Sequence, residues 1–112
     1  MMNSTNKQNI LKKIKSYIGF AKKSGNIKIG ADNIMSCNKS KLILISKSAS
    51  DNTINKLSNY VKKINSSILI INEKYAEFIF ETDKIKAISL LDNNLSNAIK
   101  SEFKKLEDTI LE

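Results

Sequence analysis

The chain has 112 residues, 41% of them apolar, and a formal net charge of +8 that comes entirely from lysine, since arginine and histidine are absent. This length predicts one compact domain over residues 1–112, and the apolar content is sufficient for a buried core. No apolar run approaches the roughly 20 residues of a membrane span, and the polar N-terminus lacks the apolar stretch of a secretory signal. We therefore expect a cytoplasmic protein with no membrane partner.

Hydrophobic periodicity predicts helices and strands in alternation, beginning with a helix over residues 5–23. The later helices are expected over residues 32–38, from the polar 48–53 connection to 63, over 74–80 and over 95–111. Strands are expected over residues 27–29, 41–46, 68–71 and 85–90. The runs at 42–45 and 68–71 are apolar on both faces, which predicts strands covered on both sides. Such alternation is typical of an α/β fold, with a mostly parallel or mixed four-stranded sheet between two helical layers.

Charge is distributed unevenly along the chain. Residues 1–47 contain ten lysines and one acid, Asp32, for a net charge of +9, whereas residues 48–112 contain nine lysines and ten acids, for −1. The absence of arginine and proline is typical of an AT-rich genome, which explains abundant lysine but not the shortage of acids in the first part. A one-sided positive field attracts polyanions, and lysines displace counterions from a phosphate backbone. Nucleic acid is therefore the first partner to consider.

Several chemistries are excluded by composition. Cys37 is the only cysteine, so an internal disulfide is impossible, and the lack of histidine argues against a zinc site and against Ser-His or Cys-His catalysis. Glu77 and Glu81 are four residues apart, which we interpret as a solvated helix face. The tyrosines, the phenylalanines and Cys37 are expected in the core. We expect no cofactor, no metal and no enzymatic activity.

Gly30 begins a strand-to-helix turn in the acid-poor part of the chain, with Asp32 and Asn33 in the first helical turn. One interpretation is that Asp32 or Asn33 simply caps the helix. The other is that the helix N-terminus binds phosphate through its free amides and dipole. Nearby lysines keep the second interpretation open; they are Lys22, Lys23, Lys28, Lys39 and Lys41.

Several segments together resemble one family. They are Ile18-Gly19-Phe20-Ala21, Lys23-Ser24-Gly25, Gly30-Ala31-Asp32, the more specific Ala49-Ser50-Asp51-Asn52-Thr53, and Asp92-Asn93-Asn94-Leu95-Ser96. Over about residues 8–105 the chain resembles the kink-turn-binding ribosomal proteins (the L-seven-Ae and L-thirty-e superfamily), and among them the bacterial YlxQ-type branch. The resemblance implies a three-layer α/β/α sandwich with a four-stranded mixed sheet, and binding of structured RNA.

The RNA-contact turn of that family reads Gly-x-Asn-Glu-x-x-Lys. Here Gly30 is kept, but Asp32 stands in place of Asn, Asn33 in place of Glu and Ser36 in place of Lys. A carboxylate only accepts hydrogen bonds and repels phosphate, whereas an amide both donates and accepts. The resemblance therefore implies RNA binding more firmly than kink-turn specificity. The second contact region of the family corresponds to the loop at 81–84, where two acids weaken the expectation.

Three classes of function remain open. The first is a small RNA-binding protein in translation or RNA processing, a monomer that binds ribosomal or other non-coding RNA and interacts with the ribosome or RNA-processing proteins. The second is a protein-interaction adaptor on such an assembly that has lost kink-turn specificity. The third is an enzyme, because the fold also occurs as an appendage of RNA ribose methyltransferases, but no Gly-rich cofactor loop is present. The RNA-binding residues expected are Gly30, Ala31, Asp32, Asn33, Ser36, Lys22, Lys23, Lys28, Lys39 and Lys47.

Overall fold

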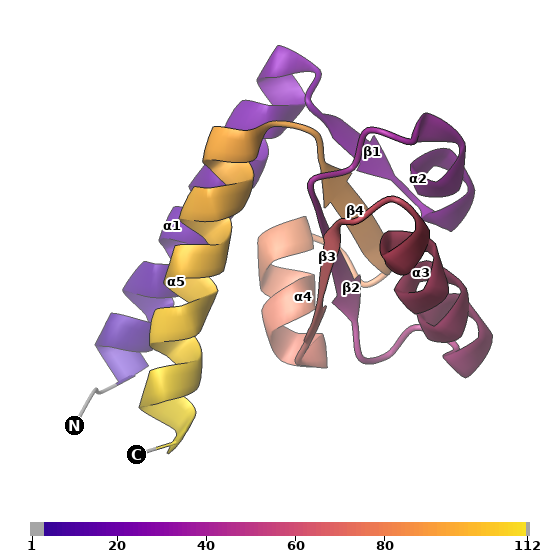
Figure 1. The fold of residues 1–112 in the computed structure, drawn as a ribbon. Coiled ribbons are helices and arrows are strands. Elements are labelled where there is room, and N and C mark those ends of the chain that lie inside the picture. The colour runs from indigo at the N-terminus through magenta and orange to yellow at the C-terminus, as the bar shows by residue number, and fades with distance from the viewer. Residues whose placement is uncertain (1–3, 112) are drawn as a thin grey trace.

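The computed structural model describes residues 4–111, and the side chains of residues 6–106. Across this range helices and strands alternate in the predicted order, with ends that differ by one or two residues from those expected (Figure 1). The elements are α1 (Ser4–Ser24), β1 (Ile27–Ile29), α2 (Ala31–Cys37), β2 (Leu42–Ser46), α3 (Asp51–Lys63), β3 (Ser67–Ile71), α4 (Glu73–Phe80), β4 (Ala87–Leu90) and α5 (Asn93–Leu111). None of the helices in the described range is long and apolar enough to cross a membrane.

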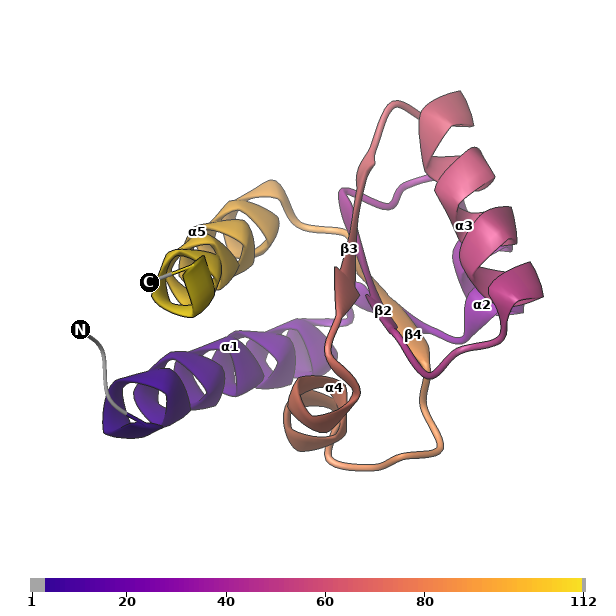
Figure 2. The same cartoon turned by 90° about the horizontal axis from the view of Figure 1, so that it is seen from below.

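The strands form one mixed sheet in the order β1-β4-β2-β3. β2 and β3 are parallel, whereas β4 runs antiparallel to both β1 and β2. Helices α1, α4 and α5 cover one face of the sheet, and α2 and α3 cover the other, as the view from below shows (Figure 2). The expected three-layer α/β/α sandwich with a four-stranded mixed sheet is confirmed.

The Leu-Ile-Leu-Ile run of β2 separates two cores. Leu42 and Leu44 pack into the cluster formed with α1, α4 and α5, while Ile43 and Ile45 pack into the cluster formed with α2 and α3. All four side chains are completely buried. Since successive side chains of a strand point to opposite faces, a run that is apolar throughout requires cover on both sides of the sheet. β2 meets this requirement because β4 and β3 flank it.

The prediction that the strand at 68–71 is fully buried is wrong. β3 lies at the edge of the sheet, and Ile70 has half of its surface exposed. Hydropathy reports how apolar a strand is, but not whether it ends up in the centre or at the edge of a sheet. The edge position follows from strand order, which depends on contacts between distant parts of the chain.

The expectation that every aromatic residue lies in the core is also wrong for two phenylalanines. Phe80 and Phe103 are buried, but Phe20 on α1 is 61% exposed and Phe78 on α4 is 38% exposed. In each helix a neighbouring residue takes the inward position instead. Ala21 on α1 and Ile79 on α4 are buried in the core next to these exposed rings.

Candidate nucleic-acid interface

Gly30 forms the corner between β1 and α2. Its backbone has φ +89° and ψ 147°, a combination of angles that residues with a Cβ atom rarely adopt. Its amide donates a hydrogen bond to the carbonyl of Ala87 at 3.0 Å, and its carbonyl accepts the amide of Ile34 at 3.0 Å. The corner is therefore fixed to β4 on one side and begins α2 on the other. Glycine is required here by backbone conformation and not by crowding, since the space that a Cβ would occupy is open.

The side chains of the first turn of α2 do not cap the helix. The N-cap position belongs to Gly30, and no side chain forms a capping hydrogen bond, so the first of the two interpretations, that Asp32 or Asn33 caps α2, is wrong. Asn33 instead donates from Nδ2 to the carbonyl of Ile29 at 2.9 Å. Asp32 is exposed, whereas Ala31 is half-buried against the core under α2. The hydroxyl of Ser36 lies 3.1 Å from the carbonyl of Asp32, one turn earlier.

A hollow with a volume of about 330 Å³ lies between α2, β1 and the residues that follow α1 and β4. We call it the α2 hollow, and its lining residues are Gly25, Lys28, Asn33, Ser36, Cys37, Lys39 and Leu91. None of these residues is acidic. Cys37 is half-buried in its wall, so the expectation that this thiol lies in the core is wrong. Four of the predicted RNA-binding residues meet in this one place.

The two lysines of the α2 hollow come from different segments, Lys28 from β1 and Lys39 from the connection between α2 and β2. Ile27 packs into the core beneath β1, so Lys28, the next residue, points to the α2 side of the sheet. Lys39 follows Asn38, which ends α2 in a left-handed conformation with φ 59°. Both lysines are exposed, and neither forms an ion pair within the part of the chain that the structure describes. Their charges are therefore available to an external anion.

A second group of polar side chains lies across β4 from Gly30. Lys86 donates from Nζ to the hydroxyl of Ser48 at 2.9 Å, and its carbonyl accepts the amide of Ser46 at 2.8 Å. Lys86 precedes Ala87, the residue bonded to Gly30, so Lys86 is held beside the corner. The predicted residue Lys47 is exposed at this same end of the sheet, where it lines a different hollow from Lys28 and Lys39.

Lys86 was missed by the sequence analysis. The resemblance placed the second RNA-contact region in the adjoining loop at 81–84, where two acidic residues argued against RNA contact. In the structure Glu81 instead lies 3.4 Å from Nζ of Lys15, and Glu81 and Asp83 line a hollow between α1 and α4. The acids of this loop thus face the α1 side, while Lys86 reaches toward Ser48. The sequence alone does not indicate that the acids of this loop and Lys86 point to different sides of the molecule.

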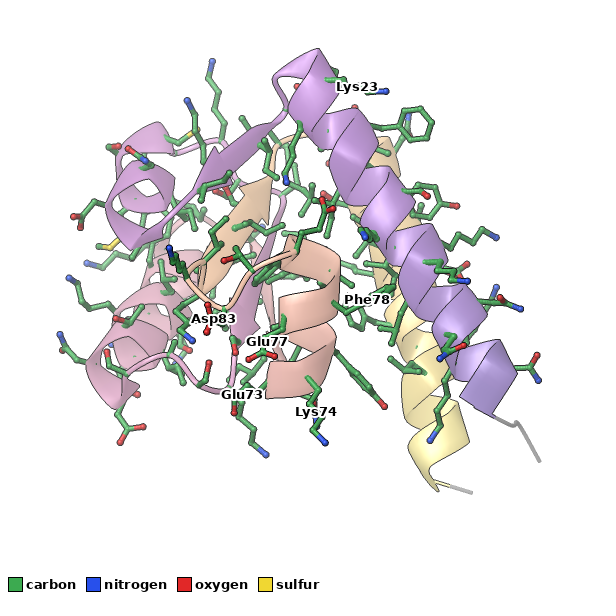
Figure 3. All side chains as sticks on the ribbon, turned by 180° about the vertical axis from the view of Figure 1, so that it is seen from behind. Lys23, Glu73, Lys74, Glu77, Phe78 and Asp83 are labelled. Atoms are coloured by element: carbon green, nitrogen blue, oxygen red, sulfur yellow. The ribbon has the colours of Figure 1, made fainter. Side chains whose placement is uncertain are left out.

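Lys22 and Lys23 occupy a different place from the other predicted residues. Both are exposed in the last turn of α1, which ends at the positive-φ residue Gly25. Figure 3 shows Lys23 at the end of α1 with its side chain pointing away from α2. The structure thus brings together Lys28, Asn33, Ser36 and Lys39, holds Gly30, Ala31 and Asp32 at the adjoining corner, and leaves Lys23 outside this group.

The order of strands and the distribution of helices define the class of fold, an α/β/α sandwich with a four-stranded mixed sheet, which is the fold that the resemblance implied. No protein-family profile matches the chain. No curated protein matches it either.

Similar solved structures come from bacteria, a protist and archaea. A Bacillus halodurans protein of unknown function has a TM-score of 0.71 at 16% identity, covering 82% of this chain and 97% of that one. A Giardia lamblia protein, described as a 15.5 kDa RNA-binding protein, has a TM-score of 0.62 at 16% identity, covering 96% and 92%. An archaeal translation termination factor has a TM-score of 0.55 at 18% identity, covering 75% of this chain but 25% of its own. At these identities the similarity establishes the fold alone.

Proposed function

We propose that this chain is a small, non-catalytic RNA-binding protein of the L-seven-Ae and L-thirty-e superfamily. The observation that carries the proposal is the α2 hollow, which is lined by Lys28 of β1 and Lys39 of the connection after α2 and by no acidic residue. Phosphate groups attract such paired ammonium groups, and the hydroxyl of Ser36 and the amide of Asn33 line the same hollow. The descriptions of the Giardia protein as RNA-binding and of the archaeal chain as a termination factor support the same assignment.

The mode of binding follows from the chemistry of the lining. α2 has only seven residues, so its dipole is small and the lysines supply most of the attraction for phosphate. A-form RNA hides its major groove from side chains. The ligand is therefore a distorted RNA, such as a kink-turn or an internal loop, whose opened groove admits α2. Gly30 permits close approach at the corner because it carries no side chain.

The test of this proposal is the salt dependence of RNA binding. Fluorescence anisotropy with a kink-turn duplex, an internal-loop RNA and a straight duplex measures affinity over a range of salt concentrations. Each lysine that touches a phosphate contributes about one unit to the slope of log affinity against log salt. Replacing Lys28 and Lys39 by glutamine is expected to lower the slope by about two units, with the largest loss of affinity on the distorted RNAs.

A matched control variant loses the same number of positive charges, but on the other face of the sheet. Lys12 on α1 and Lys104 on α5 are both exposed, and both helices lie on the face opposite α2. The Lys12→Gln, Lys104→Gln variant is expected to keep the original slope within about half a unit. Equal slopes for the two double variants would mean that RNA responds only to total charge, which contradicts a site at α2.

The RNA panel also addresses the narrower assignment. We propose that the chain belongs to the YlxQ-type branch and acts in translation or RNA processing on ribosomal or other non-coding RNA. The substituted turn makes a general preference for distorted RNA more consistent with this sequence than strict kink-turn recognition. Affinities for the kink-turn and the internal loop are therefore expected to agree within about tenfold.

A second candidate function is that of a protein-interaction adaptor. The observation that favours it is the position of Asn33, whose amide is engaged with the carbonyl of Ile29 and so has one donor fewer for a base edge. Ser36 is similarly turned toward the helix backbone. If the protein binds none of the three RNAs, yet co-purifies with a ribosomal assembly after nuclease treatment, the adaptor function replaces the first proposal.

A further inference from the structure

A second hollow lies between α1 and α4, on the face of the sheet opposite α2, with a volume of about 490 Å³. We call it the Phe78 hollow, and its lining residues are Lys15, Glu77, Phe78, Glu81, Thr82 and Asp83. Three carboxylates and one ammonium group give it a net negative charge within a chain of +8. Phe78, Glu77 and Asp83 are labelled on and beside α4 in Figure 3. The charge of this hollow is opposite to that of the α2 hollow.

The exposed ring of Phe78 is an observation independent of the acids, and it also indicates a cationic ligand. Nζ of Lys15 lies 5.0 Å from the centroid of this ring and 3.4 Å from a carboxylate oxygen of Glu81. An aromatic face attracts a cation electrostatically within about 6 Å. The ring and the carboxylate thus form a position that a positive group occupies, and in the free protein the group is Lys15.

We propose that the Phe78 hollow binds an arginine-containing segment of a protein partner. A guanidinium is planar, stacks on an aromatic face and forms two parallel hydrogen bonds with a carboxylate, so it matches a ring beside Glu81 better than an ammonium does. It displaces the Lys15 ammonium, whose side chain remains partly exposed and free to move into solvent. Glu77 and Asp83 attract further basic residues of the same segment.

The chemistry of the lining identifies this class of partner and rejects others. Three carboxylates repel the phosphates of RNA, so the hollow is not an extension of the α2 site. The chain contains no arginine, so a second copy supplies no guanidinium. The partner is therefore a different, basic protein. The site is independent of the proposed RNA-binding function, and both hollows are accessible at once because they lie on opposite faces of the sheet.

The test is a titration of the intact protein, without RNA, against a fluorescently labelled peptide of alternating arginine and glycine. A peptide with lysine in place of arginine is the comparison ligand, and anisotropy reports binding. The arginine peptide is expected to bind more tightly than the lysine peptide. Phe78→Ala is expected to weaken arginine-peptide binding by about two- to five-fold. Glu81→Gln, which keeps the shape of the side chain, is expected to weaken it by about two- to five-fold.

Two control variants make the same types of substitution, phenylalanine to alanine and glutamate to glutamine, outside the Phe78 hollow. Phe20→Ala removes an exposed phenylalanine from α1, and Glu73→Gln removes a carboxylate from the first turn of α4. Neither residue lines the Phe78 hollow, so both variants are expected to bind the peptide as the original protein does. Because Phe20 and Phe78 are exposed, the alanine variants are expected to fold, which circular dichroism verifies.

Replacing Lys15 gives the most discriminating result. If Lys15 occupies the position that the guanidinium takes, Lys15→Ala removes the competitor and strengthens arginine-peptide binding by about three-fold. If the peptide only responds to overall charge, Glu73→Gln weakens it as much as Glu81→Gln, and the proposal is overturned. Unchanged binding by Phe78→Ala, absence of binding, or self-association that Phe78→Ala abolishes would overturn it too. None of these outcomes depends on whether RNA binds at α2.

Discussion

The hydroxyl of Tyr60 lies 3.1 Å from the backbone nitrogen of Asn38 and 3.1 Å from its side-chain oxygen Oδ1. The hydroxyl accepts the first hydrogen bond and donates the second, so a residue of α3 holds the left-handed turn that ends α2. Lys39 directly follows this turn and lines the α2 hollow. The position of a candidate phosphate-binding lysine thus depends on a contact between residues 22 positions apart.

Tyr60→Phe removes both hydrogen bonds while keeping the ring in the core. We expect the free energy of unfolding to fall by about 1–2 kcal/mol, because the amide of Asn38 loses a partly buried partner. RNA affinity is expected to fall as well, since Lys39 is less firmly positioned. Urea denaturation and the anisotropy assay measure the two effects. Tyr17→Phe is the control, because the Tyr17 hydroxyl forms no hydrogen bond among the described residues, and a comparable loss there would contradict this explanation.

Gly30→Ala tests the backbone requirement at the corner. The open space around a Cβ excludes a steric clash, so the cost comes from the φ of +89°, and we expect about 1–3 kcal/mol of destabilisation. Gly19 provides a control of opposite sign, because it lies inside α1 with open space around its Cβ. Gly19→Ala is expected to stabilise the protein by about 0.5–1 kcal/mol. Thermal or urea unfolding of the two variants compares these effects, and the same sign for both would be inconsistent with the geometry.

Asp32→Asn is expected to strengthen RNA binding. Asp32 is exposed beside the corner and carries the only acidic group of the first turn of α2, so its removal relieves repulsion of nearby phosphate. We expect a gain of about two- to five-fold at moderate salt, decreasing as salt screens the charge. Asp51→Asn, which makes the same change in the first turn of α3, is the control and should have a smaller effect. Weaker binding by the Asp32 variant would mean that its carboxylate accepts a hydrogen bond from RNA.

Glu102 on α5 is 6% exposed, with Nζ of Lys105 at 3.1 Å and Nζ of Lys13 at 3.6 Å. Replacing both lysines by methionine leaves a buried carboxylate without these cations, and we expect about 1–3 kcal/mol of destabilisation. Glu102→Gln leaves lysines that water solvates, because about half of each lysine side chain is exposed, so a smaller loss of about 0.5 kcal/mol is expected. Urea denaturation compares the two. A double methionine variant at Lys12 and Lys104 controls for the change in charge.

The elements and layers of the fold were predictable because they depend on local periodicity. The alternation of apolar runs with helical stripes gave the order of elements, and the doubly apolar run of β2 predicted a central strand correctly. The equally apolar run of β3 led to a wrong prediction, because strand order arises from pairing between distant segments. The exposed positions of Phe20 and Phe78 depend on which side of a helix meets its neighbours, which a helical stripe only approximates.

The candidate site was only partly predictable, for a related reason. The glycine corner and the lysines near it were predicted as a site from a turn signal and an acid-poor stretch, both of which are local. The position of Lys86 beside the corner could not be predicted without knowing that β4 pairs with both β1 and β2. The separation of Lys23 from Lys28 required the direction in which α1 ends (Figure 3). Five residues apart in the chain, these two lysines face different sides of the molecule.

Because β2 contributes side chains to both cores, it affects how the molecule unfolds. Leu42 and Leu44 anchor one helical layer, while Ile43 and Ile45 anchor the other, so neither layer loosens without disturbing the same five residues. We therefore expect unfolding to be all-or-none, and we expect the amide protons of β2 to exchange with solvent only when the whole molecule unfolds. The α2 hollow and the Phe78 hollow lie on opposite faces of the sheet, and both are expected to be lost in one melting transition.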